Sequence, residues 1–147
     1  MKILRIGTVL LAATLLLTGC SRTVHVDAAP DANNPACADV TVRLPDTVDG
    51  QTKNNTDAQA TGSWGQPSSV ITRCGITPVE VSTLRCYTVS GVDWLVDDSK
   101  APNYRFITFA RVPTTEVLVD NKVVSGAAVL DALSDAVNTG RVTRHCE

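Results

Sequence analysis

Histidine and aromatic residues are scarce in this chain, and the positions of the two histidines argue against histidine-based hydrolysis. Among 147 residues there are two histidines, two tryptophans, two tyrosines and two phenylalanines. A triad hydrolase needs a histidine base beside its nucleophile. Here His25 falls in a polar segment and His145 adjoins a cysteine, and no Gly-x-Ser-x-Gly sequence is present. We therefore do not expect a catalytic triad.

Clusters of basic residues and ordered cation-binding loops are also lacking. The formal net charge is −2, whereas nucleic acid and anionic lipid headgroups bind to local positive charge. We expect no nucleic acid partner. The carboxylates of Asp93, Asp97 and Asp98 lack the D-x-D-x-D-G spacing of a calcium loop, so a solvated acidic turn is the simpler interpretation. We expect no metal and no other cofactor.

The apolar run over residues 6–17 is too short to cross a membrane, which takes about 20 apolar residues. Lys2 and Arg5 precede the run, and Leu17-Thr18-Gly19-Cys20 ends it in a way that resembles the lipobox of bacterial lipoproteins. We predict that residues 1–19 are a lipoprotein signal peptide and that Cys20 is lipidated. Two or three acyl chains there would hold the protein on the extracytoplasmic face of the cell membrane. An ordinary secretory signal and an uncleaved anchor are the alternatives.

The remaining cysteines are Cys37, Cys74, Cys86 and Cys146. An even number of cysteines in an exported domain predicts disulfides. The absence of C-x-x-C argues against a redox site, and the spacings are not those of a zinc site. Four cysteines allow three pairings. We favour Cys74–Cys86, which would close a loop between neighbouring strands, with Cys37–Cys146, which would join the two ends of the domain.

The mature chain is expected to have two parts, a flexible tether over residues 20–36 and a single globular domain over residues 37–147. The tether is polar and holds prolines at 30 and 35, a composition that buries too little apolar area to order itself. Residues 46–62 are rich in Asp, Asn, Thr and Gln. We expect them to form a mobile loop.

Short β-prone runs predict an antiparallel sheet. Two of them flank Ser90-Gly91, a dipeptide typical of a tight hairpin. In the longest run, alternate residues would face opposite sides of the sheet, with Phe106 on one side and Arg105 on the other. The expected strands are Ser68–Cys74, Cys86–Val89, Val92–Val96, Tyr104–Val112 and Glu116–Val119.

Helical periodicity is clearest over Ser125–Asn138, where Leu130 and Leu133 share an apolar face and Gly140 follows the end. Residues 37–44 fit either a strand or a helix. The helix is slightly favoured, because Asn34 can cap it and Pro35 suits its first position. The sequence thus predicts an α+β domain: an antiparallel sheet of four or five strands packed against a C-terminal helix, with a second, N-terminal helix as the favoured alternative.

Several short stretches together resemble a known family. They are Arg73-Cys74-Gly75, Val89-Ser90-Gly91-Val92-Asp93-Trp94, Phe109-Ala110-Arg111-Val112-Pro113 and Trp64-Gly65-Gln66-Pro67. They resemble a small actinobacterial secreted and lipoprotein family that is described only as a domain of unknown function. The family often has Asn-Gly where this chain has Ser90-Gly91. The resemblance, over about residues 36–147, implies a cell-envelope location and supplies no activity, catalytic residue or ligand.

Trp94, Tyr104, Arg105 and Arg111 are the candidate binding face, because aromatic rings supply rigid contact area and arginine supplies a planar fork for carboxylates. The competing interpretation buries Trp94 in the core and leaves the arginines at the sheet edge. We expect a lipid-anchored envelope module, without enzyme activity, that binds an envelope protein or a cell-wall component. The alternative is an accessory hydrolase or transferase of envelope assembly, with an acidic site near Asp93 and Asp97.

Overall fold

The computed structural model describes residues 23–147. Residues 1–22 lie outside it, and with them the predicted signal peptide and the predicted lipidation site Cys20. The described helices are α1 (Pro35–Val42) and α2 (Gly126–Val137). The strands are β1 (Thr23–Val24), β2 (Thr47–Val48), β3 (Gln51–Thr56), β4 (Thr61–Trp64), β5 (Val70–Ile76), β6 (Arg85–Val89), β7 (Val92–Asp97), β8 (Asn103–Thr108), β9 (Arg111–Val112), β10 (Thr114–Asp120) and β11 (Arg141–Val142). No helix among these residues is long and apolar enough to cross a bilayer.

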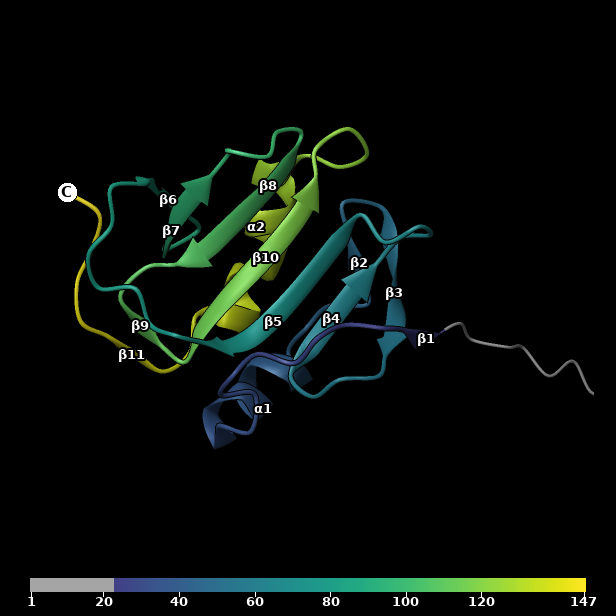
Figure 1. Cartoon of the computed structure of the whole chain (residues 1–147), viewed down its shortest axis with the longest axis horizontal. Coiled ribbons are helices and arrows are strands. Elements are labelled where there is room, and N and C mark those ends of the chain that lie inside the picture. The colour runs from purple at the N-terminus through teal and green to yellow at the C-terminus, as the bar shows by residue number, and fades with distance from the viewer. Residues whose placement is uncertain (1–22) are drawn as a thin grey trace, which may run out of the picture.

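The main sheet has nine strands in the order β1-β3-β4-β5-β10-β8-β7-β6, with β2 paired to β3 (Figure 1). The pairing of β1 with β3 is parallel, so the sheet is mixed. The predicted antiparallel sheet of four or five strands is therefore wrong in size and in type. The α+β character and the two helices are confirmed.

The polar segment 46–62 accounts for most of this difference, because it forms β2, β3 and part of β4 instead of a mobile loop. In β3 the side chains are exposed or half-buried, and the strand pairs with β4 on one side and with β1 and β2 on the other. Backbone hydrogen bonds hold it in the sheet. A strand of this kind needs little apolar alternation, so its sequence resembles a loop.

The two helices lie behind the sheet in the view of Figure 1, and the main core lies between them and the strands. Ser125 and Asn138 bound α2, and Gly140 follows at φ +73°, as predicted. The helical alternative for residues 37–44 is confirmed, because the Asn34 side chain accepts from the Ala36 amide and Pro35 begins α1. Fully buried side chains of the core include Trp64, Trp94, Val117, Val129 and Leu133.

Residues 25–34, which we call the strap, cross the other face of the sheet in front of β4 and β5 (Figure 1). Ala29 and Ala32 are buried there against Ile76, Leu95 and Ile107. The prediction of a flexible tether over residues 20–36 is thus wrong from residue 23 onward. The strap is held by a few small side chains and by backbone hydrogen bonds, neither of which its polar composition reveals.

All four predicted cysteines form disulfides, but the favoured pairing is wrong. The bonds are Cys37–Cys74, which joins α1 to β5, and Cys86–Cys146, which joins β6 to the C-terminal segment. The two ends of the domain do not meet, since β1 and the C-terminus lie at opposite sides of the molecule (Figure 1). Each disulfide therefore joins elements that are neighbours in the fold and not the two ends of the domain.

The β6–β7 hairpin is confirmed, with Val89 opposite Val92 and both Ser90 and Gly91 at positive φ. The strand predicted over Tyr104–Val112 is interrupted, because Ala110 adopts φ 45°. After this break Arg111–Val112 leaves the main sheet and pairs with β11 as a separate ribbon.

Candidate ligand-binding groove

The strap covers only part of the front face of the sheet, and a groove of about 360 Å³ lies over the part it leaves open. The strand register places the lining residues, since Asp97 is opposite Arg105, Arg105 is opposite Leu118, and Leu118 is opposite Ile71. These four positions form one row across the sheet, with about 4.8 Å between neighbours. Side chains from the loop after β7 and from the end of β10 complete it. The name groove is used for the surface of Ile71, Asp97, Lys100, Arg105, Leu118 and Asp120.

A buried ion triad borders the groove. Glu116 on β10 is fully buried, and its two carboxylate oxygens accept from the Nε atoms of Arg73 and Arg105 on the two neighbouring strands. The side chains of Arg73 and Arg105 are 28% and 41% exposed. A buried carboxylate is costly unless it is paired and hydrogen-bonded. Glu116 thus holds both guanidinium groups at the front face.

The two arginines differ in how many donors they have left. Arg73 also contacts Glu116 through Nη2, and its Nη1 donates to the carbonyl oxygen of Asp27 on the strap at 3.4 Å. Arg105 uses Nε alone, and its terminal nitrogens have no acceptor among residues 23–147. A guanidinium held at one nitrogen presents its other N–H groups in a fixed plane. Arg105 therefore offers a positioned fork of donors to the groove.

Of the four residues of the predicted binding face, only Tyr104 and Arg105 line the groove. Trp94 is fully buried in the main core, and Arg111 is 5% exposed and donates to the carbonyl oxygen of Thr139. Burial lowers the pKa of Arg111, and the charge of Asp93 partly opposes this. The Tyr104 ring stacks on Phe106, with ring centroids 6.1 Å apart. Of the four, Arg105 has unpaired donors at the groove.

The predicted acidic cluster is likewise dispersed. Asp93 and Asp97 lie four residues apart on β7, about 13 Å along the strand. Asp98 pairs with Arg85 on the neighbouring strand β6. This arrangement does not bring two carboxylates to one substrate atom. Among residues 23–147 no group of three or more His, Cys, Asp or Glu side chains could hold a metal ion.

Asp93 instead holds the C-terminal segment. It is 7% exposed and accepts from the Thr88 hydroxyl at 2.5 Å and from the Cys146 amide at 3.3 Å, and it lies 2.9 Å from Nδ1 of His145. Burial alone would raise the pKa of Asp93. The hydrogen bonds from Thr88, His145 and Cys146 outweigh burial and lower the pKa below its ordinary value. Asp93 thus fastens the tail next to the Cys86–Cys146 disulfide.

Asp97 is the acidic residue that does line the groove. Hydrogen bonds from Ser99 are the main cause of its lowered pKa, and Arg105 and Lys100 lower the pKa further. The Ser99 amide donates to Oδ1 at 3.0 Å, and the Ser99 side chain is a second hydrogen-bond partner of the carboxylate. A carboxylate can accept about four hydrogen bonds, so Asp97 is a charged group that keeps acceptor capacity toward the groove.

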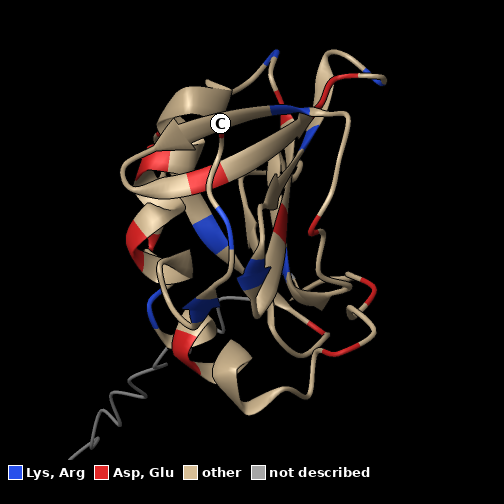
Figure 2. Ribbon diagram, turned by 90° about the vertical axis from the view of Figure 1, so that its left-hand side faces the viewer, with Lys and Arg blue, Asp and Glu red and all other residues tan. Residues whose placement is uncertain are grey.

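No local sequence signal indicated the role of Glu116 or Arg73. Glu116 comes directly before the apolar run Val117-Leu118-Val119 of β10, a position that in isolation indicates an exposed residue. Only the register shows that Arg73 lies opposite Glu116 on β5 and that Arg105 lies diagonally from it on β8. Acidic and basic positions both occur along the described part of the ribbon (Figure 2).

The comparisons with known proteins add one finding. A family model described as "Protein of unknown function (DUF3515)" matches residues 1–144. No curated protein and no solved structure matches the chain.

Proposed function

We propose that this chain, which belongs to the DUF3515 family of proteins of unknown function, is a non-enzymatic binding module of the cell envelope. Lipid on Cys20 would hold it at the extracytoplasmic face of the membrane. Its ligand would be an envelope protein or a cell-wall component, bound in the groove. The fork of unpaired donors on Arg105 is the observation that supports this most.

The chemistry of Arg105 indicates what part of a ligand it would take. A planar guanidinium binds carboxylate or phosphate through two parallel hydrogen bonds, and such charge-assisted bonds are stronger than neutral ones. The Nε bond to buried Glu116 orients the fork before a ligand arrives, so little side-chain entropy remains to be lost on binding. An anionic group should therefore bind at Arg105.

The acidic residues support catalysis less well. A general acid or base is most effective when its pKa lies near the working pH, whereas the pKa values of Asp93 and Asp97 are both lowered from an already acidic 3.8. Asp93 is also bonded to the tail. The accessory hydrolase or transferase alternative therefore has no specific observation in its favour.

Binding at Arg105 can be tested with N-acetyl-alanyl-alanine, a probe with a carboxylate and no amine. The full chain would be labelled with ¹⁵N and followed by NMR in detergent micelles. We expect the Arg105 Nε–H signal and the Leu118 amide signal to shift on titration. Arg105→Lys keeps the charge and removes the fork, and should weaken binding about tenfold. Arg85→Lys, in an exposed pair with Asp98, is the matched control. Equal binding by all three proteins would contradict the proposal.

The lipid anchor is tested separately. Cys20→Ala should move the protein out of the membrane fraction and remove the mass of the acyl chains, whereas Thr18→Ser should leave both unchanged. A Cys20→Ala protein that stays in the membrane fraction would argue against lipidation.

A further inference from the structure

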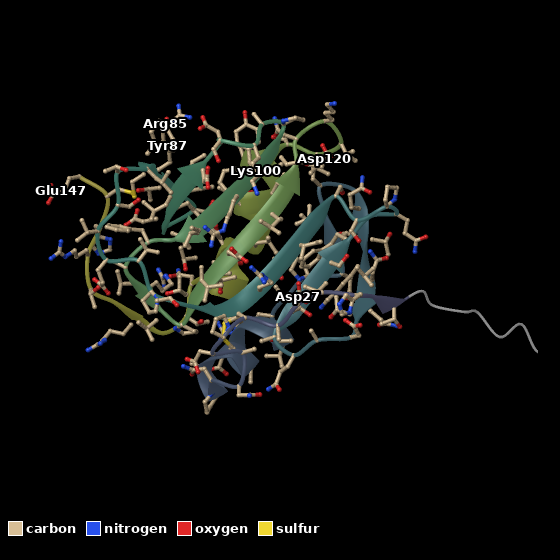
Figure 3. All side chains as sticks on the ribbon, in the orientation of Figure 1. Asp27, Arg85, Tyr87, Lys100, Asp120 and Glu147 are labelled. Carbon is tan, nitrogen blue, oxygen red and sulfur yellow. A yellow bond between two sulfur atoms is a disulfide. The ribbon has the colours of Figure 1, made fainter. Side chains whose placement is uncertain are left out.

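The groove carries balanced charge. Lys100 and Arg105 are its basic residues, and Asp97 and Asp120 are its acidic residues. Lys100 and Asp120 lie at the same end of β8 and β10 (Figure 3). A ligand with negative charge alone would meet two carboxylates beside the two cations. The lining therefore fits a ligand that carries both signs.

The positions of the charges make this more specific. Asp97 and Arg105 are register partners on adjacent strands, so their backbones are about 5 Å apart. Asp97 has hydrogen bonds from Ser99 alone and keeps acceptor capacity, and the terminal nitrogens of Arg105 are without acceptors among residues 23–147. An ammonium group and a carboxylate group a few ångströms apart on one ligand would satisfy both side chains together.

The floor beside this pair is apolar. Leu118 is 36% exposed, although it lies in the middle of β10, and Ile71 is half-buried next to it on β5. These two side chains can contact a small aliphatic substituent. The volume of about 360 Å³ lies at the lower end of the range for small-molecule sites. A group the size of one or two amino acids fits it.

We infer that the groove binds a small zwitterion the size of a free dipeptide, with the carboxylate on Arg105, the ammonium on Asp97 and an aliphatic side chain over Leu118 and Ile71. This rests on the proposed function and specifies its ligand class. A ligand with a phosphate or carboxylate alone would use Arg105 and leave Asp97 unpaired.

Three matched probes separate the two charges: alanyl-alanine, N-acetyl-alanyl-alanine without the ammonium, and alanyl-alanine amide without the carboxylate. Each is titrated into the ¹⁵N-labelled full chain in micelles, and the shifts of Arg105 Nε–H and of the Leu118 and Ile71 amides are fitted. We expect free alanyl-alanine to bind about threefold to fivefold more tightly than either blocked form, as one partly exposed ion pair allows. Asp97→Asn should abolish the preference over the acetylated probe and leave the affinity for that probe unchanged or higher. Asp135→Asn, on α2, should change neither.

The outcomes distinguish the two proposals. Equal affinity for the free and acetylated peptides, with both lost in Arg105→Lys, would overturn the zwitterionic ligand and leave the anion site standing. Tighter binding of the amide than of the free peptide would also overturn it. If none of the three probes shifts the groove signals, both the ligand class and the proposed binding site at Arg105 are wrong.

Discussion

The amide of Asp31 donates to the carbonyl oxygen of Gly75 at 2.9 Å, and this contact fastens the strap to the end of β5. Gly75 has φ +96°, and a Cβ there would lie 2.3 Å from the carbonyl oxygen of Asp31. The strap approaches the sheet this closely only because residue 75 has no side chain. The segment is thus part of the fold and not a spacer.

Gly75→Ala should therefore destabilise the protein by about 2–3 kcal/mol, combining left-handed backbone strain of about 1–2 kcal/mol with the clash against the strap. Gly91→Ala is the matched control, because Gly91 has φ +78° and open space around its Cβ position. Its cost should be the backbone strain alone. Urea unfolding measures the destabilisation of both variants. Hydrogen exchange should show loss of protection of the Asp31 amide only in Gly75→Ala. Equal costs would show that the strap does not depend on this contact.

Glu116→Gln should destabilise the protein by about 2–4 kcal/mol. Glu116 carries the only negative charge of the triad, so its removal leaves the charges of Arg73 and Arg105 without a partner. Breaking a buried ion pair in this way typically costs about 3–5 kcal/mol. The lower part of the range applies here because Arg73 and Arg105 reach solvent. Glu147→Gln, at the exposed end of the chain, should cost almost nothing. If Glu116→Gln and the wild type unfold at the same urea concentration, the triad contributes little to stability.

Asp93→Asn should loosen the C-terminal segment, at a cost of about 1–3 kcal/mol near pH 7. The folded pKa of Asp93 is lowered from 3.8, so its contribution is present above that pH and is lost as pH falls through the folded pKa. The stability difference between wild type and variant should shrink as pH falls below 3.8 and through the folded pKa of Asp93. Urea unfolding curves of both proteins at pH 7 and below pH 3.8 measure this difference.

The disulfides provide an internal control for the same variant. Asp93→Asn should speed reduction of Cys86–Cys146, next to the released tail, and should leave Cys37–Cys74 unchanged. Mass spectrometry of alkylated peptides after mild reduction separates the two bonds. Equal acceleration of both would point to general destabilisation rather than to release of the tail.

The pair of His25 and Asp57 should make attachment of β1 depend on pH. Nδ1 of His25 lies 2.6 Å from Oδ2 of Asp57, and this hydrogen bond raises the pKa of His25 above 6.5 and lowers the pKa of Asp57 below 3.8. The stability contributed by charged His25 is lost as pH rises through the folded pKa of His25. The stability contributed by charged Asp57 is lost as pH falls through the folded pKa of Asp57. The pair should be intact between about pH 4 and 6.5.

NMR titration of the His25 ring tests this pair. Asp57→Asn should return the pKa of His25 close to 6.5. Asp27→Asn should change it less, because the nearest Asp27 oxygen is 3.8 Å from the ring. Exchange protection of the Asp57 amide, which donates to the Val24 carbonyl oxygen, should weaken above the folded pKa of His25. A His25 pKa that Asp57→Asn leaves unchanged would contradict this pairing.

Local patterns predicted the elements that depend on local interactions. The apolar face of α2, the Asn34 cap of α1 and the Ser90-Gly91 hairpin all involve residues within a few positions of one another. The prediction failed for β3 and for the strap, whose order comes from backbone bonds to distant segments. The side-chain pattern of a polar segment does not predict backbone hydrogen bonds to distant segments.

The candidate site shows the same division. Arginine was identified as the residue type that would bind an anion, and Arg105 was among the candidates. Its partner Glu116 is eleven positions away, and Arg73 is 43 positions from Glu116. Trp94 was a plausible contact residue until its side of β7 proved to face the helices.

What the sequence alone determined is the inventory: a C-terminal helix, a hairpin at Ser90-Gly91 and four cysteines available for two crosslinks. Composition and short-range periodicity are enough for these, since each depends on residue type or on neighbours along the chain. Only the alignment of the nine strands determined which cysteines pair. It also determined that Arg105 keeps free donors beside the buried carboxylate of Glu116. Alignment depends on contacts between distant segments, and no stretch of the chain contains that information by itself.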